Sequence, residues 1–357
     1  MTRKSGIELL RIIAMLLIVA HHFAVAPSWS DANFGFNFYW LKILASFGRI
    51  SVGIFFVICG YFAYNKKCFK WQRIFKILRP TWFYSIMFFI LAVVTYFTNI
   101  NLTLPLQGVV IQSFFPLLSS PYWFVSEYVA INLLLPYLKR WFDALGDRDF
   151  LKCLGLLVIF SILPNLILTP LTGNTFSMIS FPCSLIYATI GYGIHRFEQT
   201  IYKYKGVVGV SSILALAAIA VGPFIIRTFN NIGFENFPGN FFWEVNSLPC
   251  LILASAAFIF FNSLQFQSKI INYIADLTFG VYLIHENPIV RDWLWSGRGI
   301  LQVTSHLADG KLHFVCYSAL IILCIFALCL IIECIRKTLL FIFKKIFTKN
   351  VPHTHAQ

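Results

Sequence analysis

The chain has 357 residues, of which 59% are apolar and only 12% are charged, and it carries a formal net charge of +14. About a quarter of the residues of a soluble domain are charged, so this composition excludes an ordinary soluble protein and indicates a multi-pass membrane protein. The positive charge does not indicate a nucleic-acid partner, because most cations lie in short segments between apolar stretches. The nine cysteines are scattered and form no C-x-x-C pair, which argues against zinc ribbons and disulfide frameworks, and they are interpreted as apolar packing residues. No metal site is expected.

Ten apolar stretches are predicted to be transmembrane helices. In chain order they cover residues 6–26, 43–64, 80–98, 122–140, 151–169, 177–195, 206–226, 246–263, 270–286 and 312–335. The predicted fold class is therefore an all-α polytopic membrane protein. Residues 1–335 form a single predicted transmembrane domain, and residues 336–357 a basic amphipathic tail on the cytoplasmic membrane surface.

Lysine and arginine are distributed unevenly around these spans. They precede the first span, follow the second, fourth, sixth and tenth, and are sparse in the loops expected on the opposite side. Cytoplasmic loops carry the excess of cations in membrane proteins. Because an even number of spans puts both ends of the chain on one side, we predict that both termini are cytoplasmic.

The first span, GIELLRIIAMLLIVAHHFAVA, carries ionisable side chains that are rare within the membrane and often mark a site. At 3.6 residues per turn, the path from Arg11 to His22 returns to within roughly 20° of its starting direction, about 16 Å further along the helix. His21 lies roughly 80° away. Arg11 and His22 therefore share one face and form a candidate site. Alternatively, Arg11 extends to the membrane surface, and the histidines only form hydrogen bonds with neighbouring helices.

The second span contains RISVGIFFVICGYF, residues 49–62. Gly53 and Gly60 are seven residues apart and fall near one helix face, where small residues allow another helix to approach closely. Cys59 lies in apolar surroundings that raise a thiol pKa, so it is interpreted as a packing residue and not as a nucleophile. Arg49 is either an anchor at the outer end of the span or a site residue.

A cationic stripe precedes the third span. Lys70, Arg73, Lys76 and Arg79 are spaced three residues apart in KCFKWQRIFKILRPTWFY, so they lie close together if the segment is helical. Cytoplasmic topology and attraction to anionic lipid account for such a stripe. The functional alternative is a site for the phosphates of a cytosolic cofactor, which arginine binds in a bidentate manner.

Several of these features occur together in one family. Arg11 followed by His22, a glycine-flanked Phe-Phe segment and the RIFK sequence at residues 73–76 resemble the acyltransferase 3 family, integral-membrane O-acyltransferases of bacterial surface carbohydrates. YWFVSEYVAINLLLPYL at residues 122–138 resembles a family helix that begins with Trp-Phe and has a proline near its end. DLTFGVYLIHE at residues 276–286 resembles the family's late G-x-Y-L-x-H segment, which contains His285 here.

The resemblance implies roles for individual residues. Arg11 and His22 correspond to the family's essential pair. Arg73 and Lys76 correspond to the two arginines of its R-x-x-R motif; lysine keeps the charge at the second position but loses the bidentate geometry, and Arg79 lies nearby to compensate. The family's Ser-Gly-Tyr is Cys59-Gly60-Tyr61 in this chain.

Other polar residues in the spans have two interpretations each. Glu127, close to Trp123, either pairs with Arg49 or orients a sugar hydroxyl. His285 and Glu286 either bind substrate or form local hydrogen bonds. The substrate-binding candidates are Trp123, Glu127 and His285. Two further carboxylates are given structural roles: Asp276 is expected to cap the start of its helix, and Glu333 to pair with Arg336 or Lys337.

The resemblance implies an enzyme of the bacterial cytoplasmic membrane that transfers an acyl group, by default acetyl, from acyl-CoA to a hydroxyl of a surface polysaccharide or its lipid-linked precursor. No permanently bound cofactor is expected. The partners are acyl-CoA, the glycan acceptor and membrane lipids. His22 acts as a general base or carries the acyl group covalently, since histidine titrates near neutral pH.

Two other classes of membrane protein remain open. A transporter or flippase of lipid-linked sugars also places charged and aromatic groups in its spans, although no internal repeat is evident here. A glycan polymerase would more often have a large outer loop with several arginines, and the longest outer loops of this chain contain few.

The predicted topology can be tested by cysteine labelling in intact cells, after the native cysteines have been removed. A cysteine placed at position 350 should react with a membrane-impermeant reagent only after lysis, because the tail is predicted to be cytoplasmic. Labelling of this position in unlysed cells would overturn the assignment.

Overall fold

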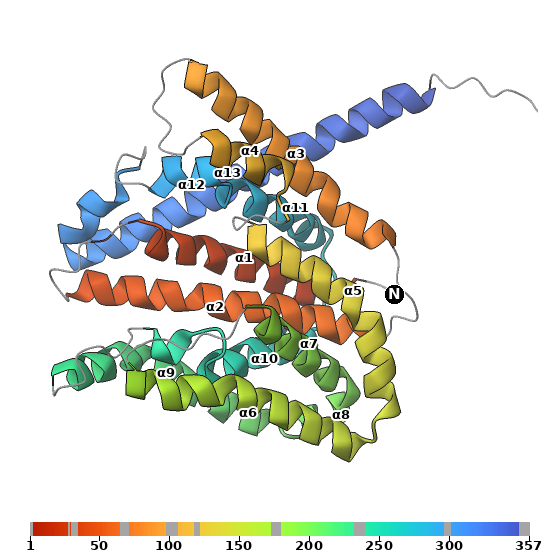
Figure 1. Cartoon of the computed structure of the whole chain (residues 1–357), viewed down its shortest axis with the longest axis vertical. Helices are drawn as coiled ribbons and strands as arrows, with labels where there is room; N and C mark the ends of the chain where they lie inside the picture. The colour runs from red at the N-terminus through yellow and green to blue at the C-terminus, as the bar shows by residue number, and fades with distance from the viewer. Residues whose placement is uncertain are drawn as a thin grey trace, which may run out of the picture.

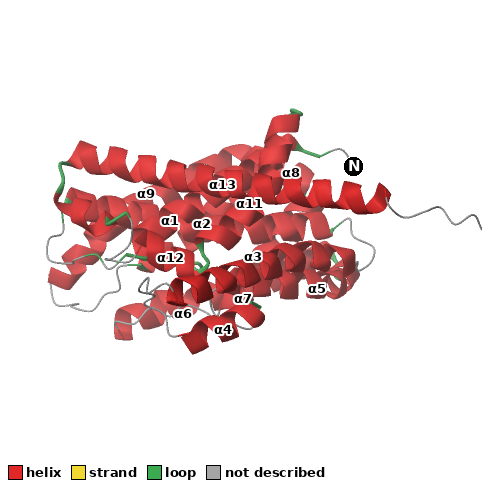
Figure 2. Cartoon of the chain, turned by 90° about the horizontal axis from the view of Figure 1, so that it is seen from above, coloured by secondary structure: helices red, strands yellow, loops and turns green. Residues whose placement is uncertain are grey.

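The computed structural model describes residues 3–27, 29, 35–64, 71–97, 106–117, 122–172, 180–231, 240–295 and 301–349. Within these ranges the regular structure consists of helices, and no strand is present (Figure 2). The predicted all-α class is therefore confirmed for the described part of the chain.

The helices follow the apolar stretches of the sequence. They are α1 (Ser5–Val25), α2 (Phe36–Ala63), α3 (Trp71–Phe97), α4 (Leu106–Phe114), α5 (Trp123–Ala144), α6 (Asp147–Thr172), α7 (Ser180–Arg196), α8 (Glu198–Lys203), α9 (Lys205–Asn231), α10 (Leu248–Ser263), α11 (Lys269–His285), α12 (Pro288–Trp295) and α13 (Lys311–Lys349). Two short 3-10 helices, η2 (Phe241–Trp243) and η3 (Val303–Ala308), precede α10 and α13.

Helices α1 and α2 run side by side through the middle of the molecule (Figure 1). Helices α3, α11 and α13 lie on the α1 side, and α6, α7, α9 and α10 on the α2 side. The crossing of α2 with α7 is close, because a Cβ atom on Gly60 would lie 1.8 Å from the carbonyl oxygen of Ala188, and one on Gly191 would lie 2.0 Å from that of Val57. Gly53 similarly faces the ring of Tyr187. The packing role predicted for Gly53 and Gly60 is confirmed.

Each of the ten predicted spans overlaps a helix, but seven helices of the described chain are long and apolar enough to cross a membrane. These are α1, α2, α3, α6, α9, α10 together with η2, and α13. Helices α7 and α11 have 17 residues each, fewer than the roughly 20 that a span needs, and much of their surface contacts other helices. Helix α5 carries Glu127, Lys139, Arg140 and Asp143. Ten crossings therefore stay a prediction.

Helix boundaries differ from the predicted spans at several places. Helix α3 begins at Trp71, so Arg73, Lys76 and Arg79 belong to its first turns and Pro80 lies inside it rather than at its start. Lys70, the first residue of the predicted stripe, lies outside the described residues. Helix α13 continues without a break through position 335 to Lys349. The apolar run predicted between the third and fourth spans contributes α4.

The start of α1 and the later part of α13 lie at the same end of the bundle (Figure 1). Arg3 forms an ion pair with Asp276 of α11, and Lys337 of α13 donates to the Asp276 carbonyl oxygen at 2.6 Å. The capping role predicted for Asp276 is wrong, because α11 begins two turns earlier and Ser268 caps it by accepting from the Ile271 amide.

Glu333 is buried in α13, and its ion pair with Arg336, predicted from the sequence, is confirmed at 2.6 Å. The Tyr84 hydroxyl of α3 donates to the same carboxylate at 2.7 Å. Gly280 of α11 makes room for the Glu333 side chain, since a Cβ atom there would lie 2.5 Å from its carboxyl carbon.

The substitution Gly60→Ala tests the α2–α7 crossing. The added methyl group must push two backbones apart, and overpacking of this kind typically costs about 1–3 kcal/mol. We expect a melting temperature several degrees lower in detergent, measured by size-exclusion chromatography after heating. Gly155→Ala in α6 is the matched control, because a Cβ atom there meets nothing within 4 Å and alanine favours helix. Equal melting temperatures would show that the crossing tolerates wider spacing.

Candidate functional site

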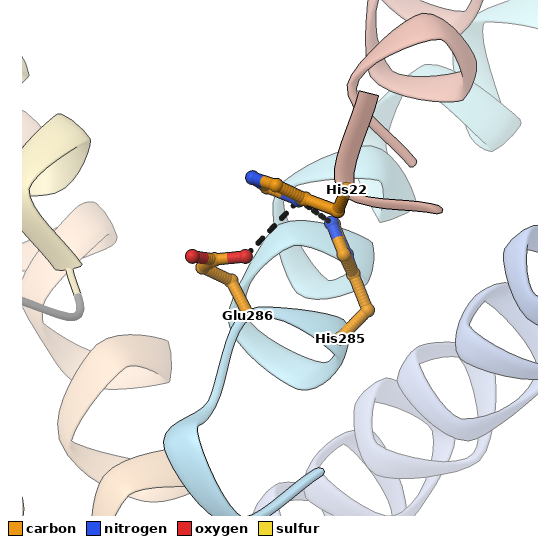
Figure 3. Close-up of side chains that lie close together, drawn as sticks. All are labelled: His22, His285 and Glu286. Carbon is orange, nitrogen blue, oxygen red and sulfur yellow. Dashed lines mark hydrogen bonds and ion pairs between the residues drawn. The ribbon is translucent and has the colours of Figure 1, made fainter. Parts of the chain in front are cut away.

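Three side chains meet where α1 and α11 end (Figure 3). The Nδ1 atom of His22, in the last turn of α1, lies 2.9 Å from Nε2 of His285 and 3.0 Å from Oε2 of Glu286. His285 is the last residue of α11, and Glu286 follows it. All three lie inside the bundle: the His22 side chain is 12% exposed, and the other two are fully or almost fully buried.

The hydrogen bonds determine which ring nitrogens carry protons. Nδ1 of His285 lies 2.6 Å from the Val281 carbonyl oxygen, and a carbonyl only accepts, so this nitrogen donates. In a neutral imidazole the other nitrogen, Nε2, then has the lone pair. His22 Nδ1 therefore donates toward His285 Nε2, and the lone pair of His22 is on its own Nε2. Figure 3 shows that nitrogen pointing away from both partners.

Glu286 is held in place by the chain that follows it. Its Oε1 accepts from Arg291 of α12 at 2.7 Å. Asn287 joins this turn to the start of α5, because its side chain donates to the Tyr122 hydroxyl at 3.0 Å, and that hydroxyl donates to the Leu283 carbonyl at 2.9 Å. The second carboxylate oxygen of Glu286 has no other hydrogen-bond partner among the described residues, so it is placed to stabilise positive charge on His22.

His21 points in a different direction from His22. Its Nδ1 donates to the Ala45 carbonyl oxygen of α2. Gly48 provides the space, because a Cβ atom there would lie 2.2 Å from the imidazole. The planes of the two rings are inclined at 63° to each other, and their centroids are 5.4 Å apart. The helical geometry predicted from the sequence therefore separates the two histidines: His21 contacts α2, and His22 contacts α11.

Arg11 and His22 lie on one continuous helix, but the structure does not bring them into contact. Arg11 forms an ion pair with Glu8 at 3.1 Å, and its side chain is 27% exposed. Arg3 lies 3.3 Å from the same carboxylate. Arg11 thus belongs to a charged cluster near the start of α1, about three turns from His22.

The other predicted site residues lie on separate elements. Arg73, Lys76 and Arg79 are exposed in the first turns of α3. Glu127 of α5 accepts a hydrogen bond from Ser184 of α7, and Trp123 is the first residue of α5.

Two charged residues of this region were not considered as site residues from the sequence: Arg291 and Glu244. Glu286 was considered beside His285 as a substrate-binding residue, because an ionisable side chain within an apolar stretch is energetically costly and often marks a site. Glu244 is the ion-pair partner of Arg49, with 4.0 Å between Oε1 and Nη2. It lies just before α10, and no local spacing relates it to Arg49.

Among the described residues, two groups of side chains have the composition of a metal site, although none was expected from the sequence. One is the His22, His285 and Glu286 cluster, and the other is His306, Asp309 and His313 before and at the start of α13. In the second group both histidines lie 2.8 Å from one Asp309 oxygen. The hydrogen bond from His306 lowers the pKa of the Asp309 carboxyl. Both groups are hydrogen-bonded internally without an ion.

The fold makes this chain a multi-pass helical membrane protein. The acyltransferase domain of the acyltransferase 3 family matches residues 4–334, essentially the whole chain. The chain therefore belongs to this family, and the resemblance found in its sequence is confirmed. Comparisons with curated proteins and with solved structures gave no match.

The neighbouring histidines allow a direct test of the site. We expect His22→Ala to abolish acyl transfer, because a general base contributes about 10²–10⁴-fold in rate. His22→Gln should also fail, since an amide cannot cycle a proton. His21→Ala should retain much of the maximal rate, because His21 is not in contact with His285 or Glu286. Activity is compared at matched membrane abundance. Equal activity of the two alanine variants would contradict the assignment of His22 as the catalytic histidine. An inactive His21→Ala variant with an active His22→Ala variant would assign that role to His21 instead.

Proposed function

We propose that this protein is an acyl-CoA-dependent O-acetyltransferase of the bacterial cytoplasmic membrane that modifies a hydroxyl of an envelope glycan or its lipid-linked precursor. The observation that carries the proposal is the position of His22 Nδ1 against His285 Nε2 and the Glu286 carboxylate. The Nδ1 of His22 is engaged by His285 and Glu286, which leaves the lone pair of Nε2 directed away from them. In a chain of an acyltransferase family, such a buried imidazole is suited to activate a hydroxyl.

In the direct route, His22 Nε2 takes the proton of the acceptor hydroxyl as its oxygen attacks the thioester carbonyl. The new ester bond forms, the carbon–sulfur bond breaks, and the proton passes from His22 to the departing coenzyme A thiolate. The carboxylate of Glu286 stabilises the intermediate imidazolium, and His285 holds the ring in orientation. In the covalent route, the same nitrogen attacks the thioester carbonyl first, and the carbon–sulfur bond breaks to release coenzyme A as a thiolate. The acceptor hydroxyl then attacks the acyl carbon, the carbon–nitrogen bond breaks, and the hydroxyl proton passes to the thiolate.

The donor would bind where the predicted cytoplasmic cations gather. Arg73, Lys76 and Arg79 are exposed at the start of α3, so they are available to the phosphates of coenzyme A. The extended pantetheine arm separates those phosphates from the thioester. It would follow the Arg11 face of α1 toward His22, a path of about 16 Å along the helix.

Charge substitutions in α3 test this donor site. Arg73→Ala and Lys76→Ala should raise the apparent KM for acetyl-CoA, because each removes a cation from the phosphates. Glutamate at either position should raise it further by repulsion. Donor affinity is measured with purified protein at saturating acceptor, and Lys152→Ala in α6 is an exposed control. Unchanged donor affinity in all four variants would show that the cationic stripe reflects membrane topology and does not bind the donor.

The function itself is tested with a deletion strain. Loss of glycan acetate with normal polymer length and amount would support the enzyme, and restoration should require an intact His22. Loss of the polymer itself would instead favour the transporter or polymerase alternatives.

A further inference from the structure

Two histidines and an aspartate meet where η3 ends and α13 begins. They are His306, Asp309 and His313, from the sequence HLADGKLH. The Nδ1 atoms of the two imidazoles each lie 2.8 Å from the same carboxylate oxygen, Oδ2 of Asp309. The three potential ligand atoms all lie within 4.8 Å of one another. We call these three residues the η3–α13 cluster.

The local backbone brings these side chains together. His306 lies in η3, and the Asp309 amide donates to the His306 carbonyl oxygen at 3.1 Å, which closes a turn between the two residues. Helix α13 begins at Lys311, so His313 lies in its first turn. Because the three residues are spaced three and then four positions apart on helical backbone, their side chains extend to the same side.

Neighbouring elements hold the η3–α13 cluster in place. The buried Asn37 side chain, in the first turn of α2, donates to the Leu307 carbonyl oxygen at 3.0 Å and to the Asp309 carbonyl oxygen at 2.8 Å. The His306 ring stacks on the ring of Tyr317 from α13, with 4.0 Å between the centroids. The backbone of the cluster and one of its imidazoles are therefore oriented before any ligand binds, as an effective metal site requires.

The donor atoms select a class of cation. Two imidazole nitrogens and a carboxylate oxygen suit zinc and neighbouring divalent transition metals, whereas calcium and magnesium prefer sites made of oxygen. Zinc holds such ligands at about 2.0–2.2 Å in a tetrahedron, so ligand atoms around it are roughly 3.3 Å apart. Each Nδ1 atom then lies about 0.5 Å further from Asp309 Oδ2 than it does here. The His313 side chain, which is 67% exposed, has room for such a rotation.

The η3–α13 cluster is accessible from solvent. The side chains of His306 and Asp309 are 33% and 28% exposed, so an ion enters without opening the helix bundle, and water completes its coordination. The ion takes the place of the proton on each Nδ1, and a neutral imidazole then carries its proton on Nε2. The two hydrogen bonds to Asp309 are thus exchanged for metal bonds from the same three atoms.

The His22 cluster has a similar composition but suits a metal ion less well. Arg291 lies 2.7 Å from the Glu286 carboxylate, so that carboxylate already has a cation, and a second cation beside it is repelled. The partners of the Asp309 carboxylate in the described chain are the two imidazoles, which are themselves metal ligands.

We propose that His306, Asp309 and His313 bind a zinc ion or a chemically similar divalent transition metal through Nδ1 of each imidazole and a carboxylate oxygen. The ion connects the end of η3 to the first turn of α13. This site is separate from the His22 cluster, and the proposal does not depend on the transferase function.

The position of the ion gives it a structural role. Asn37 already joins the backbone of this segment to the start of α2. Tyr317, on which the His306 ring stacks, also lies close to Phe23 of α1, with 6.4 Å between ring centroids. A bound ion therefore stabilises the packing of α13 against α1 and α2 at this end of the bundle.

Zinc binding to the purified full-length protein in detergent tests the proposal. His353 and His355 of the tail are changed to glutamine in every sample, so that the tail does not bind zinc. After treatment with a chelator, Zn²⁺ alone is titrated by calorimetry, and the melting temperature is measured with and without it. We expect one ion per chain and a melting temperature a few degrees higher with zinc, because a ligand of the folded state stabilises it. Failure to take up zinc, or an unchanged melting temperature at saturation, overturns the proposal.

Variants locate the ion. His313→Gln and Asp309→Asn should each weaken zinc binding by more than about tenfold, a loss typical even of a residue that only orients a ligand, and should remove the zinc-dependent rise in melting temperature. Their melting temperatures without zinc show whether the substitution itself disturbs folding. Ser305→Ala, in η3 but not a ligand, is the control and should bind zinc normally.

Two outcomes of the variant series contradict the assignment. Zinc binding that survives both His313→Gln and Asp309→Asn would show that the η3–α13 cluster is only a hydrogen-bonded turn before α13. Binding that is lost in His22→Gln instead would place the ion at the His22 cluster.

Discussion

A polar group inside an apolar helix bundle must find a partner, because no water is available to solvate it. This constraint explains much of the structure. Glu333 of α13 is buried only because Arg336 and Tyr84 reach it, and the buried Asn262 of α10 has Tyr61 and Glu198 among its partners. Each such pair ties two or three helices together. The His22 cluster is another example of the same constraint, with α1, α11 and α12 as the helices that are joined.

Glycine residues provide the space that buried polar side chains need. Gly48 and Gly280 each make room for a polar side chain from another helix, the His21 imidazole and the Glu333 carboxylate. The central helix α2 thus contacts the His21 imidazole at one end and, through Gly60, makes a close backbone contact with α7 further along. The same helix therefore sets both the position of His21 and the spacing of α2 and α7. A bulky residue at position 48 would displace His21 directly.

The helices and the importance of His22 could be predicted from the sequence because both depend on local periodicity. A run of apolar residues indicates a helix whatever it packs against, and the separation of His21 from His22 follows from the angle between adjacent residues on a helix. The contact of His22 with His285 depends on the packing of α1 against α11, and the Arg49–Glu244 pair depends on the packing of η2 against α2. No spacing in the sequence encodes either contact. The segment that resembles the family contains His285 and Glu286, but no feature of the sequence pointed to Glu244. Ten crossings stay a prediction for a related reason: α7 and α11 are apolar helices of 17 residues that pack against other helices, and a sequence does not distinguish such packing from contact with lipid.

Helix α13 has a geometric consequence for the end of the chain. With 39 residues and a rise of about 1.5 Å per residue, it is close to 60 Å long, about twice the thickness of the hydrocarbon layer. A helix of this length cannot be contained by a membrane at any ordinary tilt. Its last turns project as a stiff rod on the side where α1 begins (Figure 1). The basic residues Lys337, Lys344 and Lys345 therefore belong to the same unbroken helix as the apolar part of α13, so any tilt or shift of that apolar part moves them with it.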